Sequence, residues 1–566
     1  MFLKNKAGFL ICALALIIYF LLRLPLNLSV VCANENQGFS VIFGQSLLNW
    51  GELADGRGIV FVLLYSIVLK IFGFNTWAII AIHWVETLIV LISGFALYHI
   101  IRIVINNDFC AGFGVLIWII LISTPIGYSP LKIEIQSHYN LDGEILCVLF
   151  SVISILFLVF RCFEQINSYN KSFPVLAAIF ATFSLMSKAN GGVILIATLT
   201  WFLYIFLFKR VFFSTITPII KSYIISTILS LLFFNIILCC LNLDLLHTWK
   251  DYFFVGSYSN DYLLTFNSLT NSFLKFIIRH KFSPSNIILF LTTITFLFYG
   301  LIKCIFIKKS EKLYLFWSLV SIWGFGNIAA IIAPGFYQPY YYQLIWPVVS
   351  IMMVLGAYEL FSYLKNTSNK NLIVLISIII TIFFAYRIAV AIPAHYQLTK
   401  ELIGVSVFNQ PQSFQDPVLQ YNQTPTKRPG FLQVADAINN LLPDKTSTFY
   451  IFNFHKGGIS AFNATSYIYA KRFPPTSVAD GLLGIPNIVE SKIKTLKRDL
   501  QRRKPEILVV SEDIDLQQWQ IRHVSPFINW FNWYISDNYM LETTFNIAHI
   551  HSESKTEHFN IYRINK

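Results

Sequence analysis

The sequence predicts a polytopic α-helical membrane protein of about eleven transmembrane helices, followed by a soluble α/β domain at the carboxyl end. Of its 566 residues, 56% are hydrophobic and only 13% are charged, whereas an ordinary soluble domain has about a quarter charged residues. The apolar residues gather in blocks of roughly 17 to 25, which suits helices that cross a hydrocarbon layer. The short alternating segments of a membrane β-barrel do not dominate.

The first apolar block, 8–22, follows Lys4 and Lys6 and continues to about residue 28. It lacks a small-residue cleavage site, so we expect a retained helix with the amino terminus in the cytoplasm rather than a signal peptide. The stretch 59–74 is short and contains Lys70, and we expect it to lie along the outer interface. Ten further helices are predicted at about 77–101, 111–125, 145–160, 173–186, 192–208, 219–241, 287–307, 315–333, 344–364 and 372–392.

The basic residues of the short loops determine the predicted orientation, because cytoplasmic loops are enriched in Lys and Arg. With the interfacial assignment of 59–74, all the basic clusters share the cytoplasmic side: Arg102, Arg161, Lys209-Arg210, Lys308-Lys309 and Lys365-Lys370. A net charge of +13 that is scattered in this way does not indicate nucleic-acid binding. Eight cysteines without CxxC or metal-finger spacing indicate neither a disulfide-built module nor a zinc finger.

The composition shifts after residue 392, where charged residues return and the apolar periods shorten. We therefore divide the chain into a transmembrane domain, 1–392, with outer loops 31–76 and 127–144, and an extracytoplasmic domain, 393–566. The odd number of helices places this second domain outside. Its pattern predicts helices at 431–442, 491–503 and 527–536 that alternate with strands at 448–452, 506–510 and 559–564, which is typical of a small α/β fold.

The first outer loop is a polar island directly after the first helix, with Asn34, Glu35, Asn36, Gln37, Asp55 and Arg57. Such groups beside a bilayer are costly unless they function there. Glu35 is the carboxylate closest to the end of the first helix, where partial desolvation would raise its pKa and suit it to general-base catalysis. The alternative is a solvated loop glutamate.

Three further polar clusters fall on the same predicted side. His138, Asp142 and Glu144 open the helix at 145–160 and form either a helix cap or a site for a metal ion or an acceptor hydroxyl. Lys188 lies three residues before Gly191 and is either a lysine that snorkels to the interface or a cation for a phosphate. The aromatic loop 336–343, with Tyr340 and Tyr341, is either an interface anchor or a surface for sugar or isoprenoid stacking.

These features, in this order, resemble the integral-membrane glycosyltransferases of the GT-C class, above all the branch of the protein O-mannosyltransferases and the aminoarabinose transferase of lipid A. That branch has an acidic pair in its first outer loop, where this chain has Asn34-Glu35, and an interfacial helix that ends in Leu-Phe-Gly, here Ile71-Phe72-Gly73. Its Pro-Pro-Gly stretch corresponds to 55–60, which lacks the prolines. Further matches are Asp142 or Glu144, Ser187-Lys188-Ala189-Asn190-Gly191, the loop 340–347 and Lys-Pro-Glu-Ile-Leu-Val-Val at 504–510.

The resemblance implies a glycosyltransferase of the cell inner membrane that moves a sugar from a polyprenyl-phosphate donor to a lipid, glycan or protein acceptor at the outer face, with inversion. It implies that Glu35 is the base, that Arg57 and Lys188 bind the donor phosphate, and that Asp142 or Glu144 orients the acceptor or holds a divalent cation. The need for a metal ion stays open, with Asp142, Glu144 and His138 as candidate ligands. Expected contacts with acceptor or lipid are Asn34, Asp55, His138, Tyr340 and Tyr341.

Two other functions compete with this interpretation. A transporter or flippase of lipid-linked glycans would place its charges near the middle of the bilayer, often on broken helices. A scaffold without catalytic activity would use the outer domain to bind a partner. The polar groups of this sequence lie at helix ends on one predicted side, which favours the enzyme.

Overall fold

The structure is a computed structural model. It describes residues 4–29, 35–51, 58–124, 143–160, 172–209, 213–241, 245, 248–249, 284–306, 312–332, 339–366, 370–404, 430–444, 446–452, 466–478, 486–511, 521–548 and 556–565.

The chain divides into two compact units. The first, which we call the helical unit, comprises Met1–Leu24, Val85–Cys240 and Asp261–Gln397. The second, which we call the sheet unit, comprises Pro25–Trp84, Leu241–Asn260 and Leu398–Lys566. The sheet unit thus combines the first outer loop with the carboxyl-terminal part of the chain. The helices α1, α4 and α16 each contribute residues to both units.

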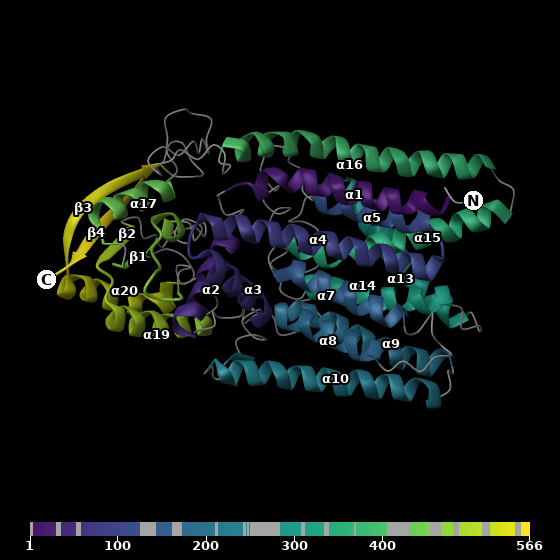
Figure 1. The fold of residues 1–566 in the computed structure, drawn as a ribbon, viewed down its shortest axis with the longest axis horizontal. Coiled ribbons are helices and arrows are strands. Elements are labelled where there is room, and N and C mark those ends of the chain that lie inside the picture. Colours follow the sequence, from purple (N-terminus) through teal and green to yellow (C-terminus); the bar gives the residue numbers. More distant parts are fainter. Residues whose placement is uncertain are drawn as a thin grey trace. The chain divides into compact units, whose positions relative to one another are not determined.

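The helical unit is a bundle of long apolar helices, and the protein is a multi-pass membrane protein (Figure 1). In the described part of the chain, seven helices are long and apolar enough to cross a membrane, and shorter apolar helices accompany them. Every predicted membrane segment is a helix, which confirms the predicted fold class. The helices are α1 (Lys4–Asn27), α4 (Thr76–Ile105), α5 (Asp108–Ser123), α7 (Gly143–Val159), α8 (Ser172–Ser187), α9 (Val193–Lys209), α10 (Phe213–Cys240), α13 (Pro284–Phe306), α14 (Lys312–Ile332), α15 (Trp346–Asn366) and α16 (Lys370–Gly404).

Small residues and hydroxyl groups join these helices, as is common where lipid supplies no hydrophobic driving force. Gly8 of α1 lies against the backbone of α5, where a Cβ atom would overlap the carbonyl of Asp108. Between α7 and α8, the hydroxyl groups of Ser151 and Ser184 lie 3.1 Å apart, and Ser154 donates to the carbonyl of Ala177 at 2.8 Å. The outward faces expose large apolar side chains, including Ile196, Leu203, Leu229 and Ile378.

The sheet unit has one four-stranded sheet with the order β1-β2-β4-β3. Strands β1 (Phe449–Phe452) and β2 (Ile507–Ser511) are parallel, and β4 (Thr556–Ile564) pairs antiparallel with β2 and with β3 (Tyr539–Ala548). The predicted strands at 448–452, 506–510 and 559–564 are confirmed. Strand β3 was not predicted, because its middle residues, Leu541–Thr544, are exposed at the sheet edge and show no apolar alternation.

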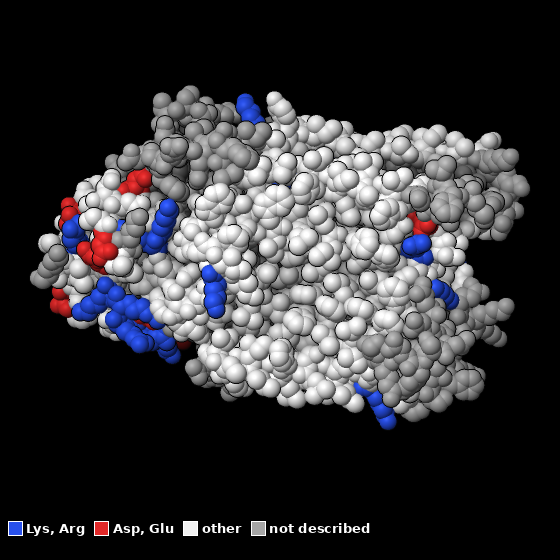
Figure 2. Space-filling view, viewed as in Figure 1, with Lys and Arg blue, Asp and Glu red and all other residues white. Residues whose placement is uncertain are grey.

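Three helices of the sheet unit come from the carboxyl-terminal part: α17 (Gly430–Leu441), α19 (Pro486–Arg503) and α20 (Ile521–Asn538). Each of them overlaps one of the three helices predicted there, and α17 ends one residue before the predicted end at 442. The side chains of the strands alternate between two cores, as the period of a strand requires. One face contributes Tyr450, Phe452, Leu508 and Val510 to a core with α19 and α20. Figure 2 shows that Lys and Arg side chains gather over α19.

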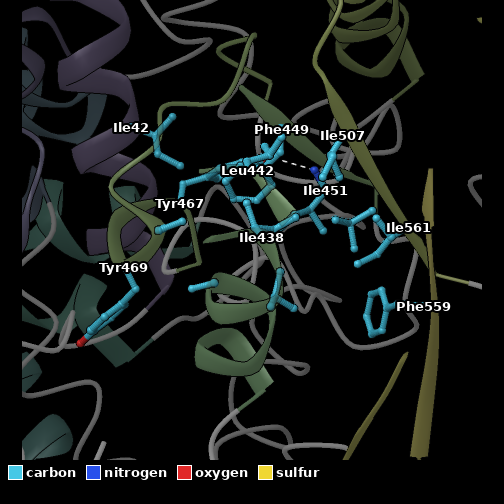
Figure 3. Close-up of a cluster of buried hydrophobic side chains, with 14 of the residues drawn as sticks. Ile42, Ile438, Leu442, Phe449, Ile451, Tyr467, Tyr469, Ile507, Phe559 and Ile561 are labelled. Carbon is cyan, nitrogen blue, oxygen red and sulfur yellow. Dashed lines mark hydrogen bonds between the residues drawn. The ribbon is translucent and has the colours of Figure 1, made fainter. Parts of the chain in front are cut away.

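The other face of the sheet packs on α17 and on residues of the first outer loop (Figure 3). Ile42 and Phe43 of α2 (Glu35–Trp50) are buried in this core, as is Ile80 near the start of α4. The phenol oxygen of Tyr467 accepts a hydrogen bond of 2.7 Å from the backbone N–H of Ile451 in β1. The core of the carboxyl-terminal sheet therefore includes side chains that lie about 400 residues earlier in the sequence.

Candidate functional site

The first outer loop is built around a pair of packed helices, α2 and α3 (Ile59–Phe72). They approach closely at Gly44, where a Cβ atom would lie 2.9 Å from the Cβ of Tyr65. Ser66 of α3 donates to the carbonyl of Gly44 at 2.9 Å. With 14 residues, α3 is about 21 Å long, too short to cross a hydrocarbon layer of about 30 Å. Its placement along the outer interface stays a prediction.

Glycines end both helices of this pair. Gly51 has φ +66° and donates its N–H to the carbonyl of Leu47 at 3.0 Å, directly after the last residue of α2, Trp50. Gly73 has φ +78° and donates to the carbonyl of Leu69 at 2.8 Å after α3. Such left-handed residues satisfy the last carbonyl groups of a helix at little cost when they are glycine.

The start of α2 is fixed by a buried hydrogen bond within the sheet unit. Gln37 Oε1 lies 2.9 Å from Nε2 of His83 in α4, and both side chains are buried. Glu35 is the first residue of α2, two positions before Gln37. The amino end of a helix favours a negative charge. The side chain of Glu35 lies outside the described residues.

Glu144 and Lys188 form an ion pair in the helical unit. Glu144 is the second residue of α7, Lys188 directly follows α8, and the two helices pack together, so the start of one meets the end of the other. The Glu144 side chain is 0% exposed and the Lys188 side chain 21% exposed. Gly143 makes room for the lysine, since a Cβ atom there would lie 3.5 Å from Lys188 Cδ and 3.2 Å from the Ser187 carbonyl.

The chain turns sharply after Lys188 through the short helix η2 (Ala189–Gly192). The N–H of Gly191 donates to the carbonyl of Lys188 at 2.8 Å. A Cβ atom on Gly191 would overlap the carbonyl of Ser184, so only glycine fits there. A second short helix, η3 (Pro339–Leu344), packs against α7 and contains the buried Tyr342. The ion pair, η2 and η3 therefore all border α7.

We expect Gly191→Ala to destabilise the helical unit by about 1–3 kcal/mol, because the added methyl group must displace backbone atoms of α8. Gly192→Ala is the matched control. A Cβ atom there would first meet Leu185 Cδ1, at 2.9 Å, the far end of a flexible side chain. Thermal unfolding of the purified proteins in detergent measures the difference. Equal midpoints for the two variants would contradict this account of the turn.

The structure brings together two of the predicted site residues, Glu144 and Lys188. Asn34, Asp55, Arg57, His138 and Asp142 lie outside the described residues, as do the side chains of Glu35, Tyr340 and Tyr341. The roles assigned to all of them stay predictions. Within the described ranges, no group of three or more His, Cys, Asp or Glu side chains could hold a metal ion. The question of a metal ligand set that includes Asp142 and His138 therefore stays open.

Sequence reasoning missed a buried ion pair between α1 and α4 in the helical unit. Arg23 Nη2 lies 3.2 Å from Glu86 Oε2, and the side chains are 2% and 4% exposed. The sequence does contain a signal for this pair. Glu86 is the only carboxylate in the apolar helix α4, and an ionisable group in such a helix needs a partner. A second buried arginine, Arg387 of α16, donates from Nη2 to the hydroxyl of Thr124 at 2.7 Å.

No protein-family model matches the sequence, and no curated protein sequence matches it. Among solved structures, the oligosaccharyltransferase AglB of Archaeoglobus fulgidus, in complex with an inhibitory peptide and a dolichol-phosphate, aligns with a TM-score of 0.51 and 12% identity, over 93% of this chain and 71% of that chain. The apo form of the same organism's oligosaccharyltransferase aligns with a TM-score of 0.51 and 13% identity, over 92% of this chain and 71% of that chain. ArnT of Cupriavidus metallidurans, bound to undecaprenyl phosphate, aligns with a TM-score of 0.49 and 11% identity, over 97% of both chains.

At this level of identity the likeness concerns the fold alone. The chain has the fold of a GT-C integral-membrane transferase, with its bundle of membrane helices and its carboxyl-terminal domain. The resemblance seen in the sequence is therefore confirmed at the level of architecture.

Proposed function

We propose that the protein is a glycosyltransferase that moves a sugar from a polyprenyl-phosphate carrier to a lipid, glycan or protein acceptor. The reaction takes place at the non-cytoplasmic face of a cell inner membrane, with the amino terminus of the chain in the cytoplasm. The observation that carries the proposal is the ion pair of Lys188 with the fully buried Glu144 at the ends of two membrane helices. The fold supports it, since AglB has the same architecture and is in complex with dolichol-phosphate.

The ion pair suits Lys188 to bind a phosphate. The buried carboxylate attracts the neighbouring ammonium and restricts its rotamers. An ammonium has three N–H donors and can contact a carboxylate and a phosphate oxygen together. In this proposal Glu144 positions Lys188, and Lys188 together with Arg57 binds the donor phosphate.

The proposed reaction is a direct displacement at the anomeric carbon. The Glu35 carboxylate takes the proton of the acceptor hydroxyl as the acceptor oxygen forms its bond to that carbon. The bond between the carbon and the carrier phosphate breaks, and its electron pair leaves with the phosphate, whose charge Lys188 and Arg57 stabilise. Attack from the opposite face inverts the configuration. Asp142 orients the acceptor or holds a divalent cation, while Asn34, Asp55, His138, Tyr340 and Tyr341 contact acceptor or lipid.

Glu35→Gln tests the assignment of the base. The amide is nearly isosteric but cannot accept the proton, so we expect transfer from a radiolabelled polyprenyl-phosphate sugar to fall about 10²–10⁴-fold. Glu490→Gln, a change of the same kind at an exposed position of α19, serves as the control and should retain wild-type turnover. Near-normal turnover in Glu35→Gln would remove Glu35 from the mechanism.

A further inference from the structure

We infer that Arg503 and Phe473 of the carboxyl-terminal domain are positioning residues, which hold the helix α2 so that Glu35 at its start reaches the reacting atoms. The inference rests on the proposed function, since it concerns the geometry of the proposed base. Its starting point is Trp50, the last residue of α2, which both residues contact. All the contacts in the argument lie within the sheet unit.

Arg503 stacks on Trp50 while its own position is fixed by the carboxyl-terminal domain. Its guanidinium carbon lies 3.5 Å from the centroid of the Trp50 ring. Nη1 donates to the carbonyl of Pro475 at 2.7 Å and lies 3.4 Å from Oδ2 of the buried Asp499. The side chain is 18% exposed. A planar guanidinium can stack with its face while its edge donates hydrogen bonds, which an ammonium does less well.

Phe473 contacts the carboxyl ends of both α2 and α3. Its ring centroid lies 4.9 Å from that of Trp50 and 5.6 Å from that of Phe74, which directly follows the Gly73 cap of α3. The preceding residue, Arg472, is buried and donates to the carbonyl of Ser447 at 2.9 Å. Phe473 therefore lies on a segment that is hydrogen-bonded next to the start of β1. Its ring contacts fix the ends of α2 and α3 relative to the sheet.

The sheet unit thus holds α2 at two places besides its start. Ile42 and Phe43 are buried in the sheet core near the middle of the helix, and Trp50 is held at its end. Glu35 lies at the opposite end of a helix of 16 residues, about 24 Å long. A tilt of about 5° at one end moves the other by about 2 Å, and a misplacement of about 1 Å can cost 10²-fold in rate. The contacts at Trp50 therefore complete the restraint on the helix that carries the proposed base, together with those at Gln37, Ile42 and Phe43.

The test compares Arg503→Met with Arg503→Lys, and uses Arg502→Met as the matched control, because Arg502 is its exposed neighbour on the same helix. We expect kcat to fall about tenfold in Arg503→Met, with little change in KM for the donor, because a misplaced base lowers the rate without changing donor binding. The kcat of Arg503→Lys should lie between those of Arg503→Met and the wild type, and the kcat of Arg502→Met should match that of the wild type. Turnover is referred to folded, monodisperse protein, so that a loss of stability alone does not lower it.

A double-mutant cycle assigns the effect to the contact itself. If Arg503 acts through Trp50, the variant Arg503→Met/Trp50→Leu has a kcat no lower than Trp50→Leu alone. Should Arg503→Met fail to fold, Phe473→Leu replaces it in the same comparison and is expected to lower kcat in the same way. Equal kcat values for Arg503→Met and Arg502→Met, or effects that multiply in the double variant, would overturn the inference. A wild-type protein that transfers no sugar would instead refute the proposed function.

Discussion

Lys188→Met is expected to abolish sugar transfer and, at the same time, to destabilise the helical unit. The substitution leaves the carboxylate of Glu144 buried without the ammonium that it contacts. Removing one partner of a buried ion pair typically costs about 3–5 kcal/mol, because the remaining charge is desolvated and uncompensated. The proposed function adds a second effect, since the donor phosphate would lose a cation. We therefore expect both a lower unfolding midpoint and a fall in kcat/KM of at least about 10².

A double variant separates these two effects. Lys188→Met/Glu144→Leu replaces the pair by apolar side chains of similar size, so most of the stability should return while transfer stays lost. The pair of Lys303 with Glu359, which joins α13 and α15 and has Tyr299 and Tyr314 beside the lysine, provides a matched control. Lys303→Met should lower the midpoint but leave the turnover of the folded protein unchanged. Recovery of transfer in the double variant would show that Lys188 has only a structural role.

Glu86→Leu is expected to be the most destabilising single change in the pair that joins α1 and α4, at about 3–5 kcal/mol. Arg23 would remain buried in the helical unit with its guanidinium deprived of the carboxylate. The double variant Arg23→Leu/Glu86→Leu removes both charges and should be as stable as the wild type or more stable. Thermal unfolding in detergent measures both. A Glu86→Leu protein with the wild-type midpoint would show that the charge of Arg23 is compensated in another way.

The membrane helices could be predicted because each is an apolar block of the right length, and lipid leaves few other solutions for such a block. The orientation rule predicts the start of α7 and the end of α8 on one side, but the contact of Glu144 with Lys188 is known only from the structure. The partner of Arg23 could not be read from spacing, since Glu86 lies 63 residues away and only tertiary packing joins them.

In the carboxyl-terminal domain, too, local sequence patterns predict the elements but not the contacts between distant residues. Strands β1, β2 and β4 are marked by local apolar pattern, whereas the exposed edge strand β3 is not. The contacts of Ile42, Phe43 and Trp50 with that domain have no local signature, because the apolar residues of a loop helix have the same pattern whether the helix packs on lipid or on a sheet.

The burial of Ile42 and Phe43 under the sheet has a consequence for biosynthesis. The ribosome produces these two side chains about 500 residues before Phe559 and Ile561, which complete the same core. During the time between, the nascent polypeptide presents an unfinished apolar surface. A product that terminates before β4 would keep that surface uncovered and its proposed base unsupported, so that maturation of the protein is coupled to synthesis of this strand.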